Sequence, residues 1–223
     1  MAPRRALPIV LIALTLIAMA VFAAWPDLDL AASRIFFESS GYFIARGTRA
    51  RAVRDFFNVL PFVVLAAFAL LYALRRAGFA TPYAPSGRAL IFLIATMAAG
   101  PGLVVNVGLK DHAHRPRPVQ TEEFGGPYQF RPWYLFNGGC PKNCSFVSGE
   151  ASEAFWMVAP ASLAPPPLKS LAIGAALLFG VGASLMRLAA GAHYLSDVVL
   201  AALFTLLIIE GARQLFLPSG EAS

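Results

Sequence analysis

Long apolar runs alternate with short polar gaps along the 223-residue chain. A helix needs about 20 apolar residues to cross the hydrocarbon core of a bilayer. Runs near that length cover residues 7–24, 56–74, 89–109, 149–164, 168–186 and 194–216. The run at 149–164 is short and contains two glutamates, so hydropathy supports it least. The pattern predicts an all-α, polytopic membrane protein with six transmembrane helices in one bundle.

The composition agrees with a membrane protein and argues against a nucleic-acid binder. Hydrophobic residues make up 58% of the chain and charged residues 13%, whereas a soluble domain usually carries about a quarter charged residues. The net charge is +6, but the basic residues lie in short gaps between apolar runs and form no nucleic-acid-binding surface. No internal repeat or linker divides the chain, so residues 1–223 are expected to form a single membrane-embedded domain.

The distribution of Lys and Arg predicts the orientation, because these residues favour the cytoplasmic side. With six spans, one side collects Arg4, Arg5, Arg75, Arg76, Arg88, Lys169 and Arg213. We therefore expect both termini in the cytoplasm and residues 110–148 and 187–194 outside. The outer gap at 25–55 also contains five arginines, but its sequence is amphipathic, which predicts an interfacial helix.

Three clusters of polar residues emerge in these outer regions. The first, KDHAHRPRP at 110–118, places Lys110 and Arg117 at its ends. Either it contacts lipid headgroups at the interface, or it binds a specific anion. The second, CSFVSGEAS at 144–152, places Ser148 and Gly149 at a helix start. There Ser148 can be a simple N-cap with Glu150 in the first turn, or the helix end can bind an anion.

The third cluster is MRLAAGAHYLSDV at 186–198. His193 and Asp197 are four residues apart and share a helix face. A carboxylate that accepts from one ring nitrogen leaves the other nitrogen basic, which suits a nucleophile or a general base. The alternative is a His–Asp pair that ties a helix end to a loop. Arg187 lies six residues before His193 and adds a permanent cation.

Taken together, the clusters favour phosphoryl chemistry at the outer ends of separate spans. Lys110, Arg117 and Arg187 can bind phosphate oxygens, and an oriented His193 lies in the same region. Asp111, His112, His114, Glu150, His193 and Asp197 also form a potential metal-ligand set of a metalloenzyme or transporter. Three neighbouring cations would repel a metal ion, so we predict neither a metal nor a cofactor.

The order and spacing of these motifs resemble the type 2 phosphatidic acid phosphatase superfamily, six-span lipid phosphatases related to vanadium haloperoxidases. The matching patterns are Lys110-x6-Arg117-Pro118, Ser148-Gly149 and Arg187-x5-His193-x3-Asp197, over the third to sixth spans. The resemblance implies metal-independent hydrolysis of a phosphomonoester through a phosphohistidine at His193, oriented by Asp197. It implies that the phosphate is bound by Lys110, Arg117, Ser148, Gly149 and Arg187.

The chain departs from the family pattern at two positions. Glu150 stands where the family has a histidine that assists the leaving oxygen, and Met186 stands where it usually has serine. Glu150 would replace the general acid if burial raised its pKa. The alternative is an ionised Glu150 that orients an arginine, with His112 or His114 supplying the proton.

The stretches RPRPVQTEEFGGP and CSFVSGEAS look like those of envelope lipid phosphatases of Gram-negative bacteria, some of which act on lipid A. This resemblance implies a bacterial inner-membrane enzyme with a periplasmic active site and a phospholipid or glycolipid substrate, with a lipid A phosphate favoured. Undecaprenyl diphosphate, phosphatidylglycerol phosphate, a phosphotransferase activity and a non-catalytic lipid-binding role remain alternatives. In an oxidising compartment, Cys140 and Cys144 are expected to form a disulfide.

Overall fold

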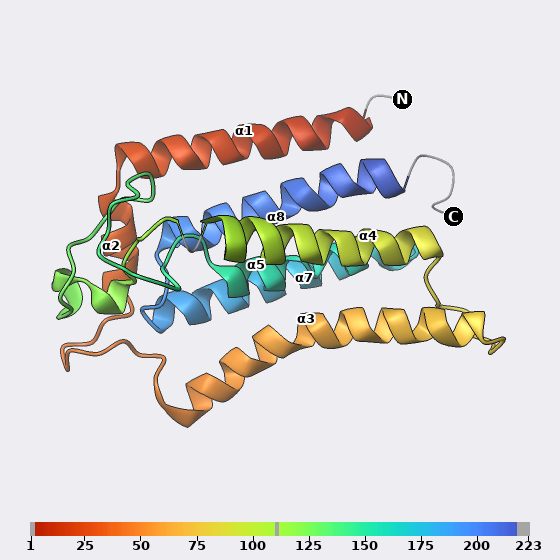
Figure 1. The fold of residues 1–223 in the computed structure, drawn as a ribbon, viewed down its shortest axis with the longest axis horizontal. Coiled ribbons are helices and arrows are strands. Elements are labelled where there is room, and N and C mark those ends of the chain that lie inside the picture. The colour runs from red at the N-terminus through yellow and green to blue at the C-terminus, as the bar shows by residue number, and fades with distance from the viewer. Residues whose placement is uncertain (1–2, 110–111, 218–223) are drawn as a thin grey trace.

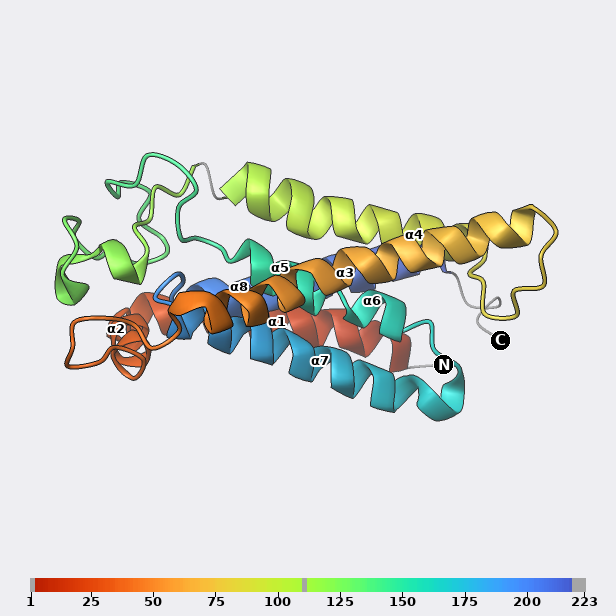
Figure 2. The same ribbon diagram turned by 90° about the horizontal axis from the view of Figure 1, so that it is seen from below.

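The computed structural model describes residues 3–109 and 112–217, and within these ranges the chain forms helices and loops without a β-strand. The prediction of an all-α fold is thereby confirmed. The helices that are long and apolar enough to cross a membrane are α1 (Pro3–Ala24), α3 (Gly47–Arg76), α7 (Pro166–Ala189) and α8 (Leu195–Phe216). Figures 1 and 2 show these helices extended along one shared direction.

The other two predicted spans are shorter or less regular. Residues 89–109 form α4 (Gly87–Met97) and then a π-helical stretch, η1 (Ala98–Leu109). Pro101 lies inside η1, where it cannot donate a backbone hydrogen bond. Residues 149–164 form two short helices, α5 (Gly149–Phe155) and α6 (Val158–Ala161). The described chain therefore contains four helices of spanning length rather than six.

The predicted interfacial segment at 25–55 is divided between two helices. A short helix, α2 (Asp27–Arg34), follows α1, and α3 then begins at Gly47, which has a φ of +86°. We predicted the second span to begin at 56, but no glycine or proline interrupts the helix between Gly47 and Pro61. Arg49, Arg51 and Arg54 consequently lie on the first turns of a 30-residue helix.

Loops distant in the sequence gather at one end of the bundle, opposite the end where α1 begins and α8 finishes (Figure 1). Backbone hydrogen bonds join them. Ala45 N–H donates to the Ala189 carbonyl and Val119 N–H donates to the Gly191 carbonyl, both at 2.9 Å. Two 3₁₀ turns, η2 (Pro118–Gln120) and η3 (Glu122–Phe124), lie in the same region.

Two buried clusters hold the helices together. In one of them, Trp156 is fully buried and donates its indole N–H to Thr96 Oγ1 at 2.9 Å. Closer to the loops, Phe146 and Val147 pack with residues of α7 and α8, including Leu188 and Val198. The segment between Cys144 and α5 is therefore part of the core, and side chains next to it have fixed positions.

Candidate active site

A pocket of about 350 Å³ opens among the gathered loops and is lined by arginines from three parts of the chain. These arginines are Arg46, Arg51, Arg54, Arg117 and Arg187. Alanines at 45, 50, 190 and 192 and a glycine at 47 line the rest, together with Met186. These small side chains leave space between the guanidinium groups, so a polyatomic anionic group can fit among the arginines.

Arg187 has the most strongly buried guanidinium of this pocket. It lies in the last turn of α7 and is 6% exposed. Its Nη1 forms an ion pair with Glu150 at 3.2 Å, whereas its buried Nε–H meets no acceptor among the described residues. A buried donor without a partner is costly, and an oxyanion in the pocket would satisfy it.

Glu150 lies between two guanidinium groups. Both of its carboxylate oxygens accept from Arg54 Nε at 3.1 Å, and Oε1 also accepts from Arg54 Nη2 at 2.6 Å. Together with the Arg187 contact, this arrangement stabilises the ionised carboxylate rather than the carboxylic acid. The geometry thus favours the alternative in which Glu150 orients arginines over the one in which it donates a proton.

His193 lies in the turn between α7 and α8 and is 2% exposed. Its Nδ1 is 2.7 Å from the carbonyl oxygen of Ser145 and 3.7 Å from a carboxylate oxygen of Asp197. The nearer acceptor is the Ser145 carbonyl, which requires a proton on Nδ1 and leaves Nε2 as the basic nitrogen. The ring therefore has the tautomer that a nucleophile at Nε2 needs.

Burial lowers the pKa of His193 to about 4, because desolvation disfavours the imidazolium; Asp197 opposes this effect, and the cations Arg117 and Arg187 add to it. We expect one histidine ring to be neutral at neutral pH and to become protonated only when the pH falls to near 4. The chain has three histidines, so ring NMR of labelled protein can follow each one, and the signal lost in His193→Gln identifies the residue. Titration of that signal near 6.5 would contradict the structure.

Asp197 lies closer to three other groups than to the His193 ring. It accepts from Arg115 Nη1 at 2.6 Å, from Ser145 Oγ at 2.5 Å and from the backbone N–H of Tyr194 at 2.8 Å. The first two side chains and Asp197 are fully buried or nearly so. Asp197 thereby fixes Ser145, whose carbonyl accepts the hydrogen bond from His193 Nδ1–H, and Tyr194, the residue next to His193.

Arg115 connects this carboxylate to α2. Its Nη2 donates to Asp29 Oδ2 at 2.7 Å, and its guanidinium lies 4.2 Å from the centre of the Tyr194 ring. Asp29 also accepts from the backbone N–H and the hydroxyl of Ser196, both at 2.7 Å. An Asp29–Arg115–Asp197 ion network, buried throughout, therefore underlies the turn that presents His193.

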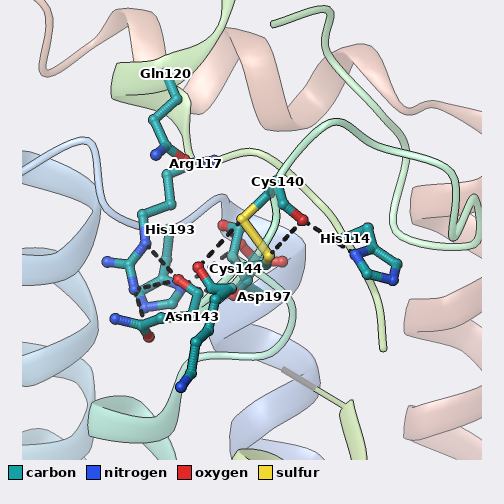
Figure 3. Close-up of a disulfide and its surroundings, with 10 residues drawn as sticks. His114, Arg117, Gln120, Cys140, Asn143, Cys144, His193 and Asp197 are labelled. Atoms are coloured by element: carbon teal, nitrogen blue, oxygen red, sulfur yellow. Dashed lines mark hydrogen bonds and ion pairs between the residues drawn. A yellow bond between two sulfur atoms is a disulfide. The ribbon is translucent and has the colours of Figure 1, made fainter. Parts of the chain in front are cut away.

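The remaining predicted residues divide into three groups. Ser148 and Gly149 are buried at the start of α5, where Ser148 Oγ accepts from Ala151 N–H at 3.3 Å, so the N-cap is confirmed. Lys110 lies outside the described residues. His114 hydrogen-bonds to the Cys140 carbonyl at 3.0 Å and lies on the opposite side of the disulfide from Arg117 and His193 (Figure 3).

Several residues of the site had no predicted role. Asp29 and Arg54 lie outside the three polar clusters, whereas Arg115, Ser145 and Ser196 lie inside them. Their partners lie far away in the sequence; Arg115 and Asp29 are 86 residues apart. The only local signal is an acidic residue in the DLDL stretch next to a predicted span, since charged side chains near apolar segments need partners.

Comparisons with known proteins agree with the motifs. The family model described as the PAP2 superfamily matches residues 88–219. A lipid A 4'-phosphatase of Francisella tularensis subsp. novicida is 36% identical over 82% of this chain and 83% of its own length. A lipid A 4'-phosphatase of Rhizobium leguminosarum is 37% identical over 85% of this chain and 88% of its own length. No solved structure matches the chain.

Proposed function

Because the chain belongs to the PAP2 superfamily, we propose that it is a membrane-embedded phosphatase that removes the 4'-phosphate of lipid A. One observation carries the proposal: the Nδ1 of a buried His193 is held by the Ser145 carbonyl, and its ring lies within the electrostatic reach of Arg117 and Arg187, two arginines that line the pocket next to Ala192. The similarity to lipid A 4'-phosphatases over most of the chain supports the choice of lipid.

In the proposed reaction, Arg117 and Arg187 bind the phosphate oxygens and stabilise the charge that develops on them. Nε2 of His193 attacks phosphorus in line, the bond from phosphorus to the sugar oxygen breaks, and the sugar leaves as an alcohol with a proton taken from solvent water; the proton lost by the water of the second step returns to the solvent. A water molecule then attacks the phosphohistidine, which releases inorganic phosphate and regenerates the neutral ring. The Ser145 carbonyl stabilises the Nδ1–H that becomes more acidic during the attack.

We assign Glu150 a positioning role, because it contacts Arg54 and Arg187 rather than a group that needs a proton. Glu150→Gln is expected to lower kcat/KM about tenfold, since it removes the charge that fixes Arg187 but leaves both arginines in place. Kinetics with purified protein measure this effect. A general acid would behave differently, with a loss of at least about 100-fold and a missing limb of the pH profile.

We further propose six membrane crossings, with both termini in the cytoplasm of a bacterium and the pocket at the periplasmic face of the inner membrane. The supporting feature is the end of the bundle opposite the pocket, where Arg75 and Arg76 end α3 and Arg88 and Lys169 lie in the first turns of α4 and α7. This bias is typical of a cytoplasmic side. An alkaline phosphatase fusion at the C-terminus should therefore be inactive.

The function is tested by measuring inorganic phosphate release from lipid A, phosphatidic acid, phosphatidylglycerol phosphate and undecaprenyl diphosphate. Detergent-purified protein is assayed with a chelator present, and mass spectrometry identifies the phosphate that lipid A loses. We expect release from lipid A at its 4' position and no release by His193→Gln. If phosphate is released preferentially from another lipid of the panel, that lipid replaces lipid A as the proposed substrate. Release from none of the lipids would overturn the proposal.

A further inference from the structure

Among residues 3–109 and 112–217, the guanidinium of Arg117 hydrogen-bonds to Asn143 alone. Arg117 Nε and Nη2 both donate to the Asn143 carbonyl oxygen, at 3.2 and 3.0 Å, and Nη2 also donates to Asn143 Oδ1 at 3.0 Å. The main chain of Arg117 is fixed separately, because its N–H donates to Gln120 Oε1 at 2.9 Å. Asn143 therefore determines where the charged end of Arg117 points, while Nη1 takes no part in this contact.

Asn143 belongs to a small covalent ring. Cys140 and Cys144 are joined by a disulfide, with their Cα atoms 5.8 Å apart, and the ring encloses Pro141, Lys142 and Asn143. Both cysteines are buried, whereas the three enclosed residues are exposed. Core packing thus holds the ends of the ring, and the cross-link limits how its exposed part can move.

The backbone of Asn143 adopts a left-handed conformation, with a φ of +52°. Asparagine tolerates this region better than most residues. The conformation directs the carbonyl oxygen toward Arg117 on the same side of the disulfide as His193 (Figure 3). An uncrosslinked loop of exposed residues would sample other conformations, and the carbonyl would then point elsewhere.

The ring is also attached to the segment that precedes Arg117. Cys140 N–H donates to the His114 carbonyl at 3.3 Å, and Ser145 N–H donates to the Arg115 carbonyl at 2.8 Å. These contacts flank Asn143 on both sides in the sequence and set the distance between the ring and residues 114–117. The disulfide, Asn143 and Arg117 consequently form one connected unit at the pocket.

We propose that Asn143 is a positioning residue for the phosphate site, and that the Cys140–Cys144 disulfide is required to keep it in place. The inference rests on the proposed function, in which Arg117 binds the phosphate of the substrate. It implies that the disulfide contributes to phosphate affinity and not only to stability. The enzyme should bind phosphate fully only when the ring is closed.

The test measures the Kd of radiolabelled inorganic phosphate by equilibrium binding to the purified full-length protein, together with the melting temperature. Cys140→Ser/Cys144→Ser is expected to raise this Kd about tenfold, as expected for a lost hydrogen-bond arrangement around a charged group. Asn143→Gly keeps the left-handed backbone and the carbonyl and removes only Oδ1, so a rise of about threefold is expected. Pro141→Ala, in the same ring, is the matched control and should leave the Kd unchanged.

A second measurement separates positioning from general stabilisation. In an Arg117→Gln background, the double serine variant should raise the Kd by less than about twofold, because its effect acts through Arg117. The inference would be overturned if the double serine variant raised the Kd as much in the Arg117→Gln background as in the wild-type protein. It would also be overturned if that variant lowered the melting temperature but left the phosphate affinity unchanged. Absence of phosphate binding by the wild-type protein would overturn the proposed function as well.

Discussion

Arg115→Met is expected to destabilise the protein by about 3–5 kcal/mol, because it leaves the carboxylates of Asp29 and Asp197 buried without their cation. Arg115 is 1% exposed and bridges the two at 2.7 and 2.6 Å. For a chain of this length, such a loss lowers the melting temperature by about 6–20 °C. Thermal unfolding of the detergent-purified protein measures it.

The control for this prediction is Arg34→Met, which removes an exposed arginine from α2, the helix that carries Asp29. It should change the melting temperature by little, since exposed charges contribute little. Adding Asp29→Asn to Arg115→Met should recover part of the lost stability, because one unpaired charge is removed. Equal melting temperatures for the wild-type protein and Arg115→Met would show that the network is not a stabilising element.

The second large effect concerns His193, the proposed nucleophile. His193→Gln is expected to lower turnover of the lipid phosphomonoester by about 10³-fold or more, because the covalent route is lost. The fold should persist, since the amide can still donate toward the Ser145 carbonyl. Rapid quenching of the wild-type enzyme with labelled substrate should trap an acid-labile phosphoryl group on the peptide that contains His193.

This experiment also separates the mechanism from the activity. If turnover is lost in His193→Gln but no label is trapped on its peptide under any quench condition, His193 acts as a base for direct attack by water. Label on a different residue would assign the role of nucleophile to that residue. Either result would still support a phosphatase activity. It would change only the role assigned to the His193 imidazole.

Local patterns were enough to predict four long apolar helices, the gathering of the polar clusters at one end of the helices and the N-cap at Ser148. These features depend on residues a few positions apart, such as Ser148 and Ala151. The hydrogen-bond partner of His193 was harder to predict, because its i, i+4 spacing to Asp197 favoured that residue. A backbone carbonyl from Ser145, 48 residues away, is the nearer acceptor, and a carbonyl has no signature in a sequence.

The role of Glu150 depended on a residue that no motif includes. The sequence spacing between Glu150 and Arg187 does not predict that they form an ion pair. Arg54 lies 96 residues before Glu150, on another helix. Without those partners, burial alone would have suggested a neutral acid, whereas two guanidinium groups favour the carboxylate. The extent of α3 was missed for a related reason, since arginines before an apolar run interrupt hydropathy without interrupting a helix.

The length of α3 has a consequence for how a lipid reaches the pocket. Thirty helical residues extend about 45 Å, whereas the hydrocarbon core is about 30 Å thick. Arg54 lies seven residues, or about 10 Å, from the beginning of the helix, and therefore near the depth where headgroups meet acyl chains. A lipid could then enter sideways from its own leaflet and present its phosphate to the arginines while its acyl chains stay in the bilayer.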